Sequence, residues 1–236
     1  MSYPVVAPAI NEYLAGLPDH AVVCEVGGGS SRRTRADWVI DLVRFEDRES
    51  IKPEDRVTAD RWIVHDICSP GPWPVANDAF DYTVCSHVLE DVRDPFKVAG
   101  ELMRISRAGY LQMPGRVHES ARSPYGLVPG SLHHRWLVEK TKDGELIFTA
   151  KSGHLVEFAS LQVHRRVSLY QGLIELYWNR DALPIRVREV TPDVEDFISF
   201  RARAEGIPEG RVRRQYEREF LRKRVAFKLL RTLRRR

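Results

Sequence analysis

Short apolar runs recur through the first half of the chain, and their lengths are those of buried strands. The five runs are residues 21–26, 38–43, 62–66, 80–85 and 109–114. They lack a strict alternation of apolar and polar residues, which is typical of strands that are covered on both faces. A helical pattern at residues 95–105 lies between the last two runs. The pattern over residues 20–115 therefore predicts an α/β fold, with a doubly wound, mostly parallel sheet and helices on both faces.

The rest of the sequence predicts additions to this sheet. Apolar residues on either side of Asp143-Gly144 predict a β-hairpin formed by residues 136–139 and 146–149, because an Asp-Gly pair favours a tight turn. Outside the sheet and the hairpin, the pattern predicts a short helix at 9–16, an edge strand at 183–187, and helices at 193–205 and 209–236.

Composition narrows the class of protein. The chain has 236 residues, of which 43% are hydrophobic and 30% charged, so it can bury a sizeable core. No run approaches the roughly 18–20 apolar residues of a membrane-spanning helix. The start, Met1-Ser2-Tyr3-Pro4, lacks the pattern of a secretory signal, and the cysteines Cys24, Cys68 and Cys85 show no CxxC spacing. We therefore expect a cytoplasmic protein with reduced thiols.

Charge is distributed unevenly along the chain. Residues 201–236 hold twelve Arg, two Lys and four Glu, a net charge of +10, so residues 1–200 carry −6 of the overall +4. Val212, Tyr216 and Phe220 recur at helical spacing among the arginines, which predicts an amphipathic cationic helix. Such a helix could lie on an anionic membrane surface, bind nucleic-acid phosphates, or dock on a protein domain. Nucleic acid is the least favoured partner, because no motif that reads bases accompanies the helix.

Polar or glycine residues follow each of the first four predicted strands. They are Gly27-Gly28-Gly29 after the first strand, Asp41 and Asp66 at the ends of the second and third, and Ser86-His87 after the fourth. Open α/β sheets bind ligands at the carboxyl ends of their strands. Glycines let a ligand approach the main chain, and a carboxylate in the position of Asp41 can accept hydrogen bonds from both hydroxyls of a ribose.

This series resembles the class I S-adenosylmethionine-dependent methyltransferases, which have a Rossmann-like fold. The resemblance is carried by Glu25-Val26-Gly27-Gly28-Gly29, by Asp41 and Asp66, and by the run from Phe80 to Val92 with Asp94-Pro95. It implies S-adenosylmethionine as cofactor and S-adenosylhomocysteine as product. The cofactor-binding residues that it implies are Glu25, Gly27, Gly28, Gly29, Asp41, Leu42, Asp66, Ile67, Ser86 and His87.

The resemblance also implies a role for most of these positions. It puts Gly27 and Gly29 against the methionine part of the cofactor and Asp41 on the ribose. Asp66 with Ile67 would meet the adenine, and Ser86 would lie near the methionine amino group.

The first crossover departs from the usual pattern of the family. Only residues 30–37 connect the first two strands, so we expect a single turn or an open loop in place of a helix. This argues against an NAD enzyme, which needs a helix N-terminus for the pyrophosphate. The stretch 29–37 resembles a subgroup in which glycan-modifying enzymes are common, which suggests a polysaccharide pathway.

Histidines are the candidate bases, because a sugar hydroxyl is a weak acid and histidine titrates near neutral pH. His133 and His134 follow the loop after the fifth strand, where the family builds its acceptor pocket, and His87 is the next candidate. Glu90, Asp91 and Asp94 could hold Mg²⁺ beside His87. Acids at the start of a helix also complement its dipole, and we favour that interpretation, so no metal site is predicted.

The leading hypothesis is an O-methyltransferase that acts on a hydroxyl of a saccharide or glycolipid, with residues 1–200 as the catalytic domain. Within that domain, residues 20–115 would bind the cofactor and 116–190 would face the acceptor. Residues 201–236 would form a basic tail that brings the protein to the inner membrane face, and a homodimer is a further expectation. The alternatives are a methyltransferase for a small natural product and a non-catalytic module, with a vestigial fold, that binds a membrane or nucleic acid.

Overall fold

The computed structural model describes residues 8–28, 35–48, 56–121, 129–164 and 172–233. The chain divides into two compact units. The first, here called the sheet unit, comprises Met1–Pro114, Val138–Ile147 and Leu173–Arg188. The second, here called the helical unit, comprises Gly115–Leu137, Phe148–Gly172 and Glu189–Arg236.

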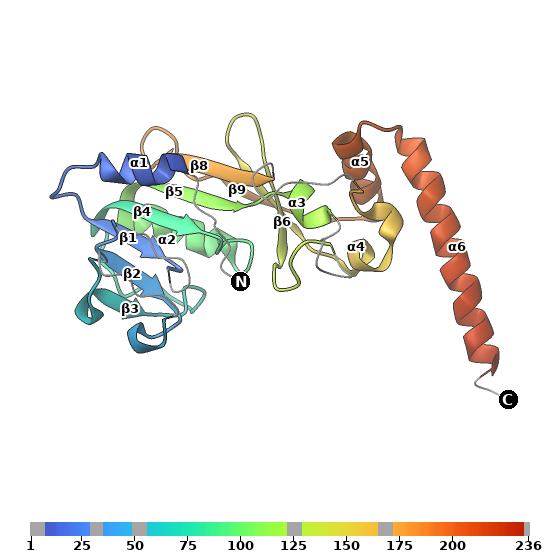
Figure 1. The fold of residues 1–236 in the computed structure, drawn as a ribbon, viewed down its shortest axis with the longest axis horizontal. Helices are drawn as coiled ribbons and strands as arrows, with labels where there is room; N and C mark the ends of the chain where they lie inside the picture. Colours follow the sequence, from blue (N-terminus) through green and yellow to red (C-terminus); the bar gives the residue numbers. More distant parts are fainter. Residues whose placement is uncertain (1–7, 29–34, 49–55, 122–128, 165–171, 234–236) are drawn as a thin grey trace. The chain divides into compact units, whose positions relative to one another are not determined.

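A six-stranded sheet forms the centre of the sheet unit, with the strand order β3-β2-β1-β4-β5-β8 (Figure 1). Its strands are β1 (Val23–Val26), β2 (Trp38–Asp41), β3 (Trp62–Val64), β4 (Phe80–Ser86), β5 (Ser106–Pro114) and β8 (Leu173–Asn179). The first five strands are parallel to one another, and β8 runs antiparallel to β5. Helices flank the sheet, so the predicted α/β fold with a mostly parallel sheet is confirmed.

The edge strand β8 was not predicted. Its side chains alternate between buried and more exposed positions along residues 173–179. The sequence there, Leu-Ile-Glu-Leu-Tyr-Trp-Asn, is mixed in character, and it joins the sheet only through long-range pairing with β5. Local periodicity cannot identify such a partner, because the register is set by the tertiary fold.

Two helices of the described part of the chain accompany the sheet. In α1 (Pro8–Ala15), Ile10 and Leu14 are buried in one cluster with strand residues such as Val23 and Tyr110. In α2 (Pro95–Ile105), the side chain of Asp94 accepts a hydrogen bond from the Lys97 N–H at 2.9 Å, and a proline begins the helix. Both features are standard helix-start signals, so the predicted bounds of 95–105 are matched. Two single 3₁₀ turns, η1 (Phe45–Asp47) and η2 (Ala59–Arg61), lie beside β2 and β3 in sequence.

A separate three-stranded sheet has the order β6-β7-β9. Its strands are β6 (Trp136–Lys140), β7 (Leu146–Ala150) and β9 (Val187–Val190). Gly144 has a φ of 86°, which provides the predicted tight turn between β6 and β7. The edge strand expected at 183–187 starts later than predicted. Leu183 instead forms an isolated bridge to Asn179, and Pro184 has no N–H to donate to a ladder.

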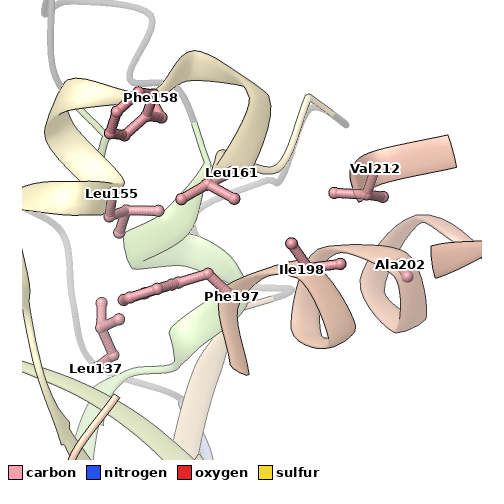
Figure 2. Packing of buried hydrophobic residues seen from close by; sticks show 8 residues of the cluster. All are labelled: Leu137, Leu155, Phe158, Leu161, Phe197, Ile198, Ala202 and Val212. Carbon is pink, nitrogen blue, oxygen red and sulfur yellow. The ribbon is translucent and has the colours of Figure 1, made fainter. Parts of the chain in front are cut away.

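The helical unit contains a buried apolar cluster, which Figure 2 shows. Its elements are α3 (Arg116–Ser120), α4 (Gly153–Glu157), η3 (Ala159–Leu161), α5 (Val194–Glu205) and α6 (Glu209–Leu233). The cluster consists of Leu137, Leu155, Phe158, Leu161, Phe197, Ile198, Ala202 and Val212. The expected start of the tail at residue 201 falls inside α5, and Val212 of α6 is fully buried. The first part of the basic helix therefore belongs to this core.

No helix among the described ranges combines the length and the apolar character that crossing a bilayer requires.

Candidate functional site

One row of residues crosses the carboxyl edge of the parallel strands. Val26 of β1 pairs with Ile40 of β2 and with Cys85 of β4, so the residues that follow these three lie side by side. Together with the pairs at either side, the row comprises Val64, Asp41, Gly27, Ser86 and Gln112. Neighbouring strands lie about 4.8 Å apart, which puts Asp41 and Ser86 about 10 Å from each other, on either side of Gly27. Three of the residues predicted for the cofactor thus come together.

The main chain after β1 is closely packed and bare of side chains. Gly27 has a φ of 77°, and a Cβ atom there would lie 2.3 Å from Cγ2 of Val88. A Cβ atom on Gly28 would lie 3.1 Å from Cγ of Glu25, which is itself buried. Glycine is therefore required at Gly27, and the sheet edge beside it offers backbone to a ligand. Gly29 lies outside the described residues, as does most of the first crossover.

Asp41 and Asp66 are held by hydrogen bonds from the turns that follow their strands. Oδ1 of Asp41 accepts from the Val43 N–H at 2.8 Å, and the residue is 8% exposed. Oδ1 of Asp66 accepts from the Cys68 N–H at 2.8 Å, which is an Asx turn. Oδ2 of Asp66 lies 3.3 Å from Nη2 of Arg93. Both carboxylates are thus oriented before any ligand arrives.

Apolar side chains are exposed beside these carboxylates. Leu42 is 71% exposed and Val64 is 52% exposed, while Ile67 is half-buried. A fixed carboxylate next to exposed aliphatic surface can hydrogen-bond a sugar and pack against the face of a flat ring.

His87 combines an unusual backbone with a buried carboxylate partner. It has a φ of 57°, a left-handed conformation that a non-glycine residue adopts only rarely. Its Nδ1 lies 3.2 Å from Oε1 of Glu90, which is fully buried. Its Nε2 is buried and has no hydrogen-bond partner among the described residues. An imidazole that a carboxylate orients through one nitrogen can accept a proton at the other.

Ser86 is connected to a chain of buried polar groups that sequence reasoning missed. Its Oγ lies 3.1 Å from Oε1 of Gln112, and Nε2 of Gln112 lies 2.9 Å from the Tyr110 hydroxyl. That hydroxyl lies 2.5 Å from Oε1 of Glu175 on β8. A polar residue within the apolar run 109–114 was the available signal for Gln112. Nothing in the local pattern pointed to Glu175.

His133 and His134 belong to the helical unit. Nδ1 of His134 lies 3.0 Å from Oε1 of Glu119, and Nζ of Lys151 lies 3.1 Å from Oε2 of the same carboxylate. The His133 ring packs edge-on against His134 at 4.5 Å between centroids and is exposed. Burial by itself would raise the pKa of Glu119, but its interactions with His134, Lys151 and the Ser131 N–H outweigh it, so the pKa lies below its ordinary value. The predicted acceptor role of His133 and His134 stays a prediction.

No protein-family model matches the chain, and no curated protein matches it. Among solved structures, it is similar to an S-adenosylmethionine-dependent methyltransferase from Mesorhizobium loti, with 16% identity, 59% of this chain and 63% of that chain covered, and a TM-score of 0.36. A putative methyltransferase from an antibiotic biosynthesis pathway of Anabaena variabilis has 14% identity, 53% and 52% covered, and a TM-score of 0.39. A possible histamine N-methyltransferase from Thermotoga maritima has 19% identity, 45% and 50% covered, and a TM-score of 0.34. The chain thus spans less than two thirds of the length of each.

Proposed function

We propose that the protein is an S-adenosylmethionine-dependent methyltransferase whose cofactor lies along the row that crosses the carboxyl edge of the sheet. The observation that carries this proposal is the alignment of Asp41, Gly27 and Ser86 by strand register. The row then offers, over about 10 Å, the Asp41 carboxylate for ribose hydroxyls, the bare main chain of Gly27 and the Ser86 hydroxyl. The buried Nε2 of His87 supports the same location, because it is a polar atom with no hydrogen-bond partner in the described parts of the chain.

Each side chain has a task in this proposal. When bound, the cofactor would supply a methyl group that its sulfonium already activates for transfer. Asp41 accepts hydrogen bonds from the ribose, and Asp66 with Ile67 borders the adenine. Gly27 would border the methionine part with bare main chain, and Val88 leaves no room for a side chain at this position.

His87 is proposed as the base in the sheet unit. Its Nε2 would take the proton from the acceptor hydroxyl, and Glu90, 3.2 Å from Nδ1, would orient the ring and stabilise its protonated form. His133 and His134 are the rival bases, since Glu119 orients His134 in the same way within the helical unit.

The acceptor is proposed to be a hydroxyl of a saccharide or glycolipid, which rests on the resemblance of residues 29–37 to glycan-modifying enzymes. A radiolabelled methyl-transfer screen of oligosaccharides against phenols and small carboxylates distinguishes this acceptor from a natural product. Activity that chelators abolish would add a divalent metal to the proposal.

Cofactor binding is tested first, by isothermal titration of the full chain with S-adenosylmethionine and S-adenosylhomocysteine. A hydrogen bond to a charged group contributes about 1.5–3 kcal/mol, so Asp41→Ala should weaken binding roughly 10- to 100-fold. Asp181→Ala is the matched control: the residue is 85% exposed and follows β8 at the opposite, amino edge of the parallel strands. Binding of neither compound to the wild type, or equal binding by Asp41→Ala, would reject the proposal.

Turnover then separates the candidate bases. His87→Ala should retain cofactor binding and lose methyl transfer, while His133→Ala and His134→Ala remain active. If His87→Ala were fully active and His134→Ala lost activity, the role of the base would be assigned to His134 of the helical unit.

An anionic membrane surface is the proposed neighbour of α6. Leu221, Val225 and Phe227 are 58%, 56% and 62% exposed, and basic residues at 222–224 lie between them. Exposed aliphatic and aromatic side chains next to arginines suit a lipid headgroup region, whereas phosphate contacts to nucleic acid would need only the charges.

The test compares co-sedimentation with vesicles that contain or lack anionic lipid. The full chain is compared with a variant carrying Leu221→Gln, Val225→Gln and Phe227→Gln. Removing α6 altogether would be a poor test, because Val212 and Tyr216 pack in the core of the helical unit. The membrane proposal would be contradicted if both proteins sedimented equally, or if the full chain sedimented equally with vesicles that contain and that lack anionic lipid.

A further inference from the structure

The buried chain of polar groups behind Ser86 has no task in the proposed function. Tyr110 and Gln112 are 0% and 1% exposed, and their strand neighbours Leu111 and Met113 are buried and apolar. Placing two polar side chains in such surroundings is costly unless they are hydrogen-bonded, and these two are bonded to each other. They connect Ser86, at the carboxyl edge of β4, with Glu175, on the antiparallel strand β8.

The carboxylate of Glu175 sets the direction of each hydrogen bond in this series of side chains. An ionised carboxylate can only accept, so the Tyr110 O–H donates to it. The Tyr110 oxygen is then the acceptor for the amide N–H of Gln112. The amide oxygen of Gln112 consequently faces Ser86, and the Ser86 O–H donates to it at 3.1 Å. The hydroxyl hydrogen of Ser86 is therefore directed into the sheet.

This direction determines how Ser86 can bond to a ligand at the sheet edge. A hydroxyl has one hydrogen and two lone pairs, so a serine whose hydrogen is committed inward offers only acceptor capacity to a ligand. Ser86 is half-buried and stands in the row with Gly27 and Asp41. The Gln112 carbonyl also accepts the His87 N–H at 2.8 Å, so the same residue fixes the backbone that follows Ser86.

We infer that Gln112, Tyr110 and Glu175 are positioning residues that make Ser86 an obligate hydrogen-bond acceptor, selecting a ligand with an amino group at this end of the row. This inference rests on the proposed function, in which that group is the amino group of the methionine part of the cofactor. The three residues act through Ser86 and touch no ligand themselves. Without the carboxylate at the far end, the chain could reverse and present the Ser86 hydrogen to the ligand instead.

The experiment uses two ligands that share the nucleoside and the sulfur. S-adenosylhomocysteine carries the amino-acid end, and 5′-methylthioadenosine lacks it. Affinities of the full chain for both are measured by isothermal titration, for the wild type, Tyr110→Phe and Glu175→Gln. Glu189→Gln, an exposed residue of β9, is the matched control.

We expect Tyr110→Phe and Glu175→Gln each to weaken the binding of S-adenosylhomocysteine about tenfold. The affinity for methylthioadenosine should stay within about twofold of the wild-type value. Unchanged binding of S-adenosylhomocysteine by both variants would overturn the inference. An equal loss of affinity for both ligands would also overturn the inference, because it would indicate that Tyr110 and Glu175 have a purely structural role. Failure of the wild type to bind either ligand would instead overturn the proposed function and, with it, this inference.

Tyr110→Phe keeps the ring, which packs 5.0 Å from Tyr177 between centroids, and thermal unfolding of each variant verifies the fold. If Tyr110→Phe does not fold, Glu175→Gln still tests the inference. Glu175 is only partly buried, so its replacement should leave the fold intact.

Discussion

Gly27 lies at the centre of the proposed cofactor row, and its replacement by alanine tests the local backbone directly. Two independent costs arise from the structure. The φ of 77° is left-handed, which costs an alanine about 1–2 kcal/mol. The new Cβ would lie 2.3 Å from Cγ2 of Val88, whereas carbon atoms in contact normally lie about 3.5–4.0 Å apart. Relieving such an overlap in a packed interior costs about 1–3 kcal/mol.

Gly27→Ala should therefore reduce the free energy of unfolding by about 2–5 kcal/mol. Urea unfolding followed by circular dichroism would show this as a midpoint lowered by roughly 1–2 M. The two costs can be separated, because Val88→Ala removes Cγ2 and leaves the backbone conformation in place. In the Val88→Ala background, Gly27→Ala should cost only about 1–2 kcal/mol, which corresponds to a coupling energy of about 1–3 kcal/mol.

Gly100→Ala is the matched control. Gly100 lies within α2, its φ is not positive, and no atom beyond its chain neighbours and its own helix backbone lies within 4 Å of a Cβ built there. Alanine should stabilise the helix at that position by about 0.5–1 kcal/mol. The reasoning fails if Gly27→Ala is as harmless as Gly100→Ala, or if its cost is the same with and without the Val88 side chain.

Two further predictions concern buried charges of the helical unit. Glu119→Gln should destabilise the protein by about 3–5 kcal/mol at pH 7, because it leaves the buried partners of this carboxylate without a counter-charge. Since the pKa of Glu119 is lowered in the folded state, its stabilisation is present above the ordinary Glu pKa of about 4.3 and is lost as pH falls through the lower folded value. The difference between wild type and variant should shrink in that acidic range, and a constant difference from pH 7 to pH 3 would contradict the assignment. Arg116→Met should cost about 2–3 kcal/mol in urea unfolding, because Arg116 is 2% exposed and pairs with Asp196 at 2.6 Å. Arg213→Met, which breaks an exposed pair with Glu195, should cost about 0–1 kcal/mol, and equal losses would show that burial does not decide the cost.

Local sequence pattern was sufficient for most of the elements. The five apolar runs became β1 to β5, because strands buried on both faces need apolar side chains at consecutive positions. The start of α2 followed from Asp94-Pro95, a cap and a first-turn residue that act within four positions of each other. The edge strands were harder: β8 was missed, and β9 begins at Val187, where the prediction ended. Their pairing depends on a partner strand that is distant in sequence.

The residue types that follow each parallel strand can be read from the sequence, and strand direction then brought Gly27, Asp41 and Ser86 to one edge. The partners of the polar side chains, by contrast, depend on how each unit folds. In the sheet unit the fold joined Ser86 to Glu175 through Gln112 and Tyr110, and in the helical unit it paired His134 with Glu119. Separation along the chain explains the difference, because a strand end is a local property, whereas an ion-pair partner 15 residues away or a hydrogen-bond partner 65 residues away is set by packing.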